Sequence, residues 1–305
     1  LNNKERLQNV NRIRLQLPFI GKWMVSQGYE GNITHKGDWS KALDFIIVDQ
    51  ELKTYDTYAA TPENFYCYGI PVLAAADGFV EKIEDYIEDN EIGKINQNQN
   101  WGNSIVIKHA EGLYTKLSHL KKDSFKVKTG DYVKQGDIVA ACGNSGRSPE
   151  PHLHFQVQTT PHIGSKTFGY PFSFYAADKN GKATIREFMV PHETEMVYNV
   201  ATSNVIKLAF EFLPGFNLSV SADGMEEGKW EVFTDAYNTS YIFCHTSKAI
   251  AYFKKNEQVF YFTSFEGDKD SLLYYFYLAC YKIYLSAEPE VMATDKFPLQ
   301  LIKSD

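Results

Sequence analysis

The segment Pro151-His152-Leu153-His154-Phe155 opens a run of apolar and polar residues that ends at Thr159. Its β-branched and aromatic residues predict a β-strand. Successive side chains of a strand point to opposite faces, so we expect His152 and His154 on one face and Leu153 on the other. Two neighbouring imidazoles are suited to bind a metal ion, provided that further ligands lie close by.

Two residues upstream are candidates for those further ligands. His35 lies in a loop-like stretch, and Asp44 interrupts the apolar run from Ala42 to Val48. A carboxylate buried in such a run is destabilising unless a cation or hydrogen bonds compensate its charge. Two histidines and one carboxylate around an open fourth position are typical of catalytic zinc. His119 ends another predicted strand, from which it could approach the same site.

Short strand-like runs dominate the first part of the chain. They cover residues 43–48, 72–83, 104–108, 113–119 and 152–159, and turns rich in Gly, Asn and Asp separate them. The predicted fold class is therefore mainly β, with an antiparallel sheet. Further runs at 206–212, 241–245, 249–253, 258–265 and 273–285 predict a smaller β-rich domain. We interpret the aromatic residues from Tyr274 to Tyr277 as the two faces of a packed strand in its core.

Charge is distributed unevenly along the 305 residues. Residues 1–190 contain 22 acidic and 22 basic side chains, whereas residues 191–305 contain 16 acidic and 9 basic ones and account for the whole net charge of −7. This step predicts a boundary between a first domain at 1–190 and an accessory domain of unknown role at 191–305. Neither part has the basic stripe that binds a phosphate backbone, so nucleic-acid binding is disfavoured.

The cysteines and the apolar segments bear on the cellular compartment. The four cysteines form no C-x-x-C pair, and we expect buried free thiols, although an exported protein could pair two of them. No apolar run is long enough to span a membrane. Because the chain begins at Leu1 without a leader, we expect a signal peptide, a membrane anchor or a larger parent chain before it.

Four motifs stand in a fixed order: His35…Asp44, Ser118-His119-Leu120, Gly143-Asn144-Ser145-Gly146 and His152-Leu153-His154-Phe155. Together they resemble the M23 (lysostaphin-like, LytM-type) zinc metallopeptidases, which cut peptidoglycan peptides. Supporting segments at 69–78, 102–109 and 127–137 follow the family's order. The resemblance covers about residues 30–160 and implies a LytM-type catalytic domain with an antiparallel β-sheet.

The resemblance also implies one Zn²⁺ per chain, with His35, Asp44 and His154 as its ligands. In the common family pattern the aspartate follows the first histidine by four residues, whereas Asp44 follows His35 by nine. Asp44 is preferred because it lies on a strand-like run, as in the family. Asp38, in the polar loop between them, is left as the alternative carboxylate.

The catalytic residues that the resemblance implies are His119 and His152. They would assist amide hydrolysis by transferring protons or by stabilising the oxyanion, and the sequence does not divide these two tasks between them. We expect their alanine variants to keep the metal and lose turnover. Three further residues are candidates for substrate binding: Asn103, Tyr114 and Arg147.

The function implied is zinc-dependent endopeptidase activity on peptide crosslinks or stem peptides of bacterial peptidoglycan, in the periplasm or at the cell surface. Both D-alanyl-diaminopimelate crosslinks and glycine bridges are open as substrates, as is the oligomeric state. One alternative is a catalytically silent LytM-type regulator or scaffold for other cell-wall enzymes, which would require missing site residues. A lipoyl- or biotinyl-carrier domain, suggested by Gly130-Asp131…Gly136-Asp137, is disfavoured because the turn at 143–146 has no lysine.

Overall fold

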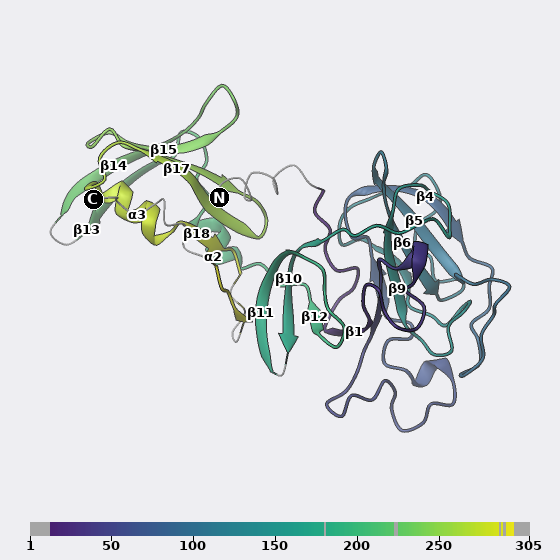
Figure 1. Cartoon of the computed structure of the whole chain (residues 1–305). Helices are drawn as coiled ribbons and strands as arrows, with labels where there is room; N and C mark the ends of the chain where they lie inside the picture. Colours follow the sequence, from purple (N-terminus) through teal and green to yellow (C-terminus); the bar gives the residue numbers. More distant parts are fainter. Residues whose placement is uncertain (1–12, 180, 223–224, 287, 289–290, 296–305) are drawn as a thin grey trace. The chain divides into compact units, whose positions relative to one another are not determined.

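The structure is a computed structural model that describes residues 13–179, 181–222, 225–286, 288 and 291–295. The described residues form two compact units (Figure 1). The first unit comprises residues 13–199 with 291–294, and the second comprises residues 200–288 with Asp295. The charge step predicts a boundary after Val190. The structure divides the chain after Asn199 instead, because strand β12 (Met196–Tyr198) pairs with strands of the first unit.

Within the described residues, eleven strands form the main sheet of the first unit, in the order β19-β11-β10-β12-β1-β2-β9-β6-β5-β4-β7. All neighbours are antiparallel except β11 and β19. The strands are β1 (Trp23–Gln27), β2 (Ala42–Ile46), β4 (Gly78–Glu84), β5 (Asn103–Ala110), β6 (Leu113–Leu120), β7 (Tyr132–Val133), β9 (Leu153–Gln158), β10 (Phe172–Lys179), β11 (Lys182–Met189), β12 and β19 (Val291–Met292). A separate pair, β3 (Pro71–Leu73) and β8 (Ile138–Ala141), and two 3₁₀ turns, η2 (Gly37–Trp39) and η3 (Pro62–Asn64), complete the unit.

The central strands β2, β9 and β6 position the candidate site. Every residue of these three strands is buried, so both faces of the sheet are covered here. Strand alternation places Phe45 and Phe155 in the hydrophobic core on one side. Asp44 and His154 face the other side and are direct partners in the register of β2 and β9. The prediction of a mainly β fold is confirmed.

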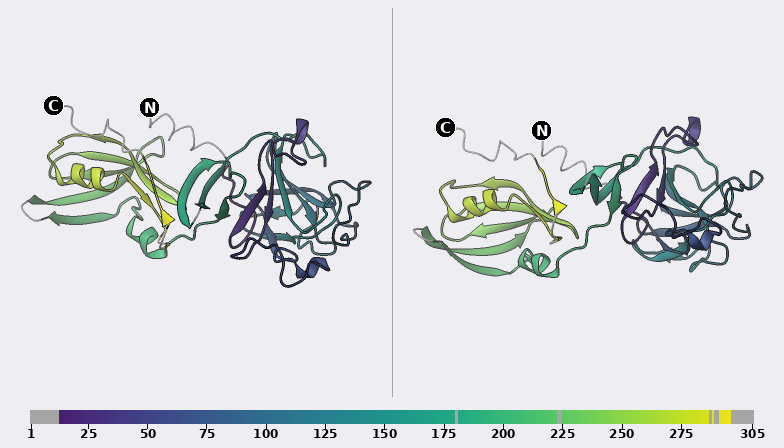
Figure 2. Two further views of the ribbon diagram at one scale, coloured as in Figure 1. Left: turned by 60° about the horizontal axis from the view of Figure 1, so that its bottom comes forward. Right: turned by 90° about the horizontal axis from the view of Figure 1, so that it is seen from below.

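The second unit contains a six-stranded antiparallel meander. Its strands follow one another in chain order: β13 (Asn217–Ala222), β14 (Met225–Thr234), β15 (Ser240–Cys244), β16 (Ile250–Lys255), β17 (Val259–Glu266) and β18 (Lys282–Tyr284). Helix α3 (Leu272–Ala279) contacts β14, β16 and β17, and Figure 2 shows it against one face of this sheet. A short helix, α2 (Asn204–Ala209), precedes the meander.

Two segments predicted as strands in this unit are helices. Residues 206–212 fall partly in α2, and the run 273–285 divides into α3 and the short strand β18. The Ser271 hydroxyl accepts a hydrogen bond from the Tyr274 amide and caps α3. Leu273, Tyr274 and Tyr277 are buried, which is the spacing of one helical face rather than of a strand. Tyr274 and Tyr277 therefore belong to the core, as predicted for the run, but on a helix, whereas Tyr275 is exposed.

The cysteines are free thiols: Cys67, Cys142 and Cys244 are buried, and Cys280 is half-buried. Among the residues that the structure describes, no helix combines the length and the apolar character needed to cross a membrane.

Candidate metal centre and active site

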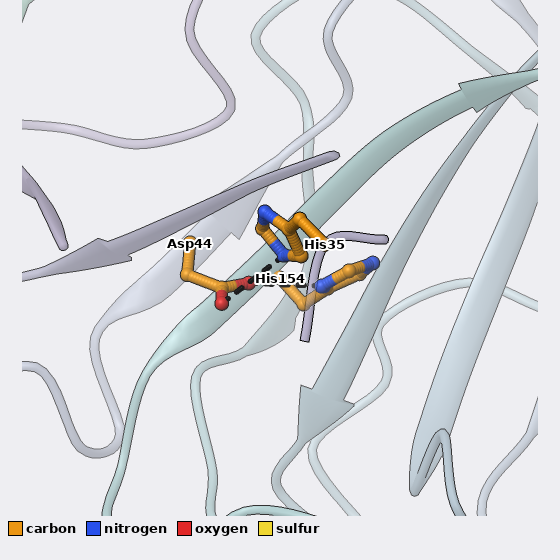
Figure 3. Close-up of side chains that lie close together, drawn as sticks. All are labelled: His35, Asp44 and His154. Carbon is orange, nitrogen blue, oxygen red and sulfur yellow. Dashed lines mark hydrogen bonds and ion pairs between the residues drawn. The ribbon is translucent and has the colours of Figure 1, made fainter. Parts of the chain in front are cut away.

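His35, Asp44 and His154 meet at the surface of the sheet where β2 and β9 pair (Figure 3). Nδ1 of His154 lies 2.8 Å from Oδ1 of Asp44, and Nε2 of His35 lies 3.2 Å from Oδ2. The three possible ligand atoms lie within 4.8 Å of one another, and all three residues are buried. Two imidazole nitrogens and one carboxylate form a donor set that catalytic zinc uses, so the structure contains a candidate metal site.

The ring orientation of His35 also fits a metal ligand. Its Nδ1 lies 2.9 Å from the carbonyl oxygen of Gly28. Since a carbonyl oxygen only accepts, Nδ1 carries the proton, and Nε2 presents its lone pair toward Asp44. This buried Nε2 has no hydrogen-bond partner. A metal ion between His35 and Asp44 would pair with this nitrogen. A histidine with a purely structural role would be expected to have both ring nitrogens hydrogen-bonded.

Gln27 supports the carboxylate and was not predicted from the sequence. Its Oε1 accepts from the backbone amides of Ile33 (3.0 Å) and Thr34 (2.8 Å). This fixes the amide so that Nε2 donates to Oδ2 of Asp44 at 2.8 Å. Strand β1 alternates buried and half-buried residues, and Gln27 occupies a buried position. The sequence could have indicated this role, because Gln27 is a polar residue at a position of β1 where the alternation predicts a buried apolar residue.

Electrostatics favour an ionised carboxylate at this point. Burial by itself would raise the pKa of Asp44, but the adjacent imidazoles of His154, His35 and His152 hold that pKa well below its usual value. Burial lowers the pKa of His154 despite the neighbouring carboxylate of Asp44. Burial also acts to lower the pKa of His35, but the interaction with Asp44 outweighs it and raises that pKa. The centre is thus a carboxylate facing two imidazoles.

His119 and His152 lie next to this cluster with their ring centroids 4.7 Å apart. Nδ1 of His119 is 2.8 Å from the carbonyl oxygen of Ser145, and Nδ1 of His152 is 3.0 Å from that of Glu150. Both carbonyls are acceptors, so each ring holds its proton on Nδ1 and leaves Nε2 as a base. Burial and the neighbouring histidines hold the pKa of His119 well below its usual value, which keeps this ring neutral.

The backbone around His119 is held in a rare conformation. His119 has φ = +60°, a region that costs a non-glycine residue about 1 kcal/mol or more and that occurs preferentially at functional sites. Gly102 and Gly146, on two loops beside it, also have positive φ. A Cβ atom on either glycine would collide with the backbone of the other loop. This close packing places the Ser145 carbonyl beneath the His119 ring.

A cavity of about 750 Å³ opens above the cluster. It is lined by all five predicted metal and catalytic residues and by Arg147, one of the three substrate-binding candidates. Its walls also include Trp39 and Trp101, whose ring centroids lie 5.8 Å apart. Beneath Trp101, Nζ of Lys116 lies 3.1 Å from the ring centroid. Lys116 is fully buried without a hydrogen-bond partner, and burial holds its pKa well below the usual value.

Residues 63–165 match the sequence profile of peptidase family M23. The chain contains an M23 peptidase domain. The match includes His119, His152 and His154, and it begins after His35 and Asp44. The other two candidate ligands, His35 and Asp44, lie before the matched residues. In the folded protein they lie close to His154 of β9.

Relatives of the M23 domain include bacterial metalloproteases. The chain is 32% identical over 149 residues to an uncharacterized metalloprotease of Buchnera aphidicola, covering 48% of this chain and 31% of that protein. It is 39% identical over 88 residues to the peptidoglycan DD-endopeptidase ShyC of Vibrio cholerae, covering 29% of this chain and 17% of that protein. It is 37% identical over 87 residues to lysostaphin of Staphylococcus staphylolyticus, covering 28% of this chain and 18% of that protein. The matched segments thus span less than a third of the length of each relative.

Three residues considered as candidates do not line the cavity. Asn103 is fully buried, and its amide bonds to both backbone groups of Ile87 and to the carbonyl of Leu120, so it joins two segments of the domain and does not line the cavity. Tyr114 is also buried and does not line the cavity. Asp38 lies in η2, is exposed, and pairs with Lys166 at 3.2 Å. Asn103 and Tyr114 are therefore not positioned to contact a substrate in the cavity, and Asp38 does not belong to the metal cluster.

Proposed function

We propose that the M23 domain is a zinc-dependent endopeptidase that hydrolyses peptides of bacterial peptidoglycan, in crosslinks or in stem peptides. The convergence of His35, Asp44 and His154 beside two histidines whose Nδ1 atoms face backbone carbonyls carries the proposal. The names of the relatives, among them a peptidoglycan endopeptidase, support the substrate class. Such a substrate implies work outside the cytoplasm, in the periplasm or at the cell surface.

Nε2 of His35, a carboxylate oxygen of Asp44 and Nδ1 of His154 would hold one zinc ion. When bound, zinc supplies a Lewis acid that polarises the scissile carbonyl and lowers the pKa of water from 15.7 to about 7. The carboxylate offsets charge at the centre, and Gln27 keeps it oriented through its 2.8 Å hydrogen bond. The rest of the chemistry is proton transfer, which this chain's own side chains perform.

His119 and His152 are suited to that transfer. Each ring is anchored through Nδ1–H to a backbone carbonyl, so its Nε2 is available to the cavity. One imidazole takes the proton of the attacking water, and a protonated ring then donates to the leaving amine or to the developing oxyanion. Because burial holds the pKa of His119 well below its usual value, this ring is neutral at the start of the reaction and can accept a proton. Such groups typically contribute about 10²- to 10⁴-fold in rate.

The test is mass spectrometry of the products after the zinc-loaded full chain is incubated with purified peptidoglycan. Diaminopimelate-type and glycine-bridged substrates are used side by side. A new amine terminus identifies the bond that is cut. We expect His154→Ala to lose both zinc and product, and His119→Ala and His152→Ala to keep zinc and lose turnover. Equal zinc loss in all three variants, or zinc binding by the wild type without product from either substrate, would contradict the proposal.

A further inference from the structure

A row of three buried polar side chains runs along β9 away from the metal cluster. His154, Gln156 and Gln158 are 5%, 1% and 0% exposed, and as alternate residues of one strand they share a face. Nε2 of His154 lies 3.0 Å from Oε1 of Gln156, and Nε2 of Gln156 lies 2.8 Å from Oε1 of Gln158. Buried amides are costly unless all their groups are paired, so this row requires an explanation.

The direction of the hydrogen bonds in the row is set at its far end. Nε2 of Gln158 lies 2.7 Å from the carbonyl oxygen of Thr160 and 3.0 Å from that of His162. Carbonyl oxygens only accept, so the NH₂ group of Gln158 must face them and its Oε1 must face Gln156. Gln156 then donates to Gln158 and, at 3.3 Å, to the carbonyl of Ser165.

The same reasoning continues to His154. With its NH₂ group committed, Gln156 presents only its oxygen to Nε2 of His154, which must therefore carry the proton. Nδ1, on the side of Asp44, is then the nitrogen that binds a metal without first losing a proton. In the other site histidines, His35, His119 and His152, a backbone carbonyl at Nδ1 fixes the proton. His154 instead depends on side chains.

We propose that Gln156, held in orientation by Gln158, is a positioning residue that fixes the proton of His154 on Nε2 and so presents Nδ1 to the metal. The inference rests on the proposed zinc site. It goes beyond the ligand set, because it assigns the affinity of that site partly to two neutral amides, Gln156 and Gln158, that do not line the cavity above the cluster. Loss of such outer hydrogen bonds typically weakens metal binding by about 10- to 100-fold.

The experiment compares Gln156→Met with Gln156→Glu in the full chain. Methionine has a similar shape but lacks the oxygen that accepts the hydrogen bond from His154, whereas glutamate keeps such an oxygen. Lys116 is the direct partner of residue 156 in the register of β6 and β9 and lies across from the new carboxylate. Zinc affinity is measured by competition with a chelator. We expect Gln156→Met to bind zinc about 10- to 100-fold more weakly and Gln156→Glu to restore most of the affinity. Thermal unfolding of the metal-free proteins checks that each variant is folded.

A second measurement separates orientation from simple packing. In ¹⁵N-labelled, zinc-loaded protein, the Nε2–H proton of His154 should give a slowly exchanging, hydrogen-bonded resonance that Gln156→Met weakens and Gln156→Glu retains. Unchanged zinc affinity in Gln156→Met with an unchanged His154 resonance would overturn the inference alone, as would equal losses in both variants. Absence of zinc binding by the wild type would overturn the proposed function and this inference with it.

Discussion

The two large sheets of this chain bury different kinds of side chains. In the first unit, the face around β2, β9 and β6 contains Asp44, His154, Gln156 and Lys116, all buried. In the second unit, the face against α3 is an aromatic and aliphatic core. Among the described residues with buried polar or charged side chains, Ser271, the cap of α3, is the one that belongs to the second unit.

The two sheets are therefore stabilised in different ways. Burial of apolar area stabilises the second sheet directly, since each fully buried large side chain contributes about 1.5–3 kcal/mol. One face of the central strands of the first sheet also packs in an apolar core, but the other face buries charges and amides, which contribute little unless every group is paired. A partly unpaired polar face is expected where a ligand completes it. Substitutions on each sheet should therefore affect different properties of the protein.

The largest effect is expected from Asp44→Ala. The variant leaves two imidazoles without the carboxylate, so we expect zinc to be lost and product formation to fall by about a thousandfold or more. Metal content after dialysis, measured by mass spectrometry, and product analysis check this. Asp38→Ala is the matched control, because Asp38 is exposed and pairs with Lys166. If Asp38→Ala loses zinc and Asp44→Ala keeps it, the assignment of the ligand is wrong.

On the second sheet, Phe260→Ala should act on stability alone. Phe260 is fully buried in β17 and packs against Phe210, Phe253 and Phe262. Its truncation is expected to cost about 3–5 kcal/mol of unfolding free energy. Denaturant unfolding and zinc titration of the same sample measure the two properties separately. A parallel fall in zinc affinity would mean that the two units do not behave independently.

Lys116→Met should stabilise the first sheet at neutral pH. It removes a buried amino group without a hydrogen-bond partner, and we expect a gain of about 1–3 kcal/mol. The folded pKa of Lys116 lies well below its unfolded value of about 10.4, so between the two the unfolded wild type binds more protons. Wild-type stability should therefore rise with pH in that window, and the advantage of the variant should shrink. Urea unfolding at pH 7 and pH 9 tests this, and an advantage that is constant or grows would contradict it.

The smallest effect is expected from Tyr114→Phe. The ring is buried and does not line the cavity, so kcat/KM should change less than about twofold. Arg147→Ala provides the contrast, because Arg147 lines the cavity and its loss should raise KM. Steady-state kinetics on one defined peptide substrate compares the two. A large loss of kcat/KM in Tyr114→Phe would restore the sequence-based expectation of substrate contact.

Sequence patterns were informative where periodicity and chemistry agree. The alternation around His154 and the charge within the run of Asp44 predicted both strands and suggested that these two side chains meet at one site. The metal and catalytic roles stay predictions. Prediction failed where tertiary context decides. The aromatic residues of α3 have strand propensity, but the Ser271 cap and the packing against the sheet produce a helix. Gln27 gave only a weak signal, since its role depends on backbone amides that folding brings to it.

The pairing of β2 with β9 has a consequence for the nascent chain. Asp44 and His154 are separated by 110 residues, and the loop between them must close before the two side chains meet. Such long-range contacts are slow to form and cannot exist before the later strand has left the ribosome. A chain interrupted before β9 therefore has His35 and Asp44 but no complete ligand set. Under the proposed function, hydrolytic capacity would arise only when the first unit is whole.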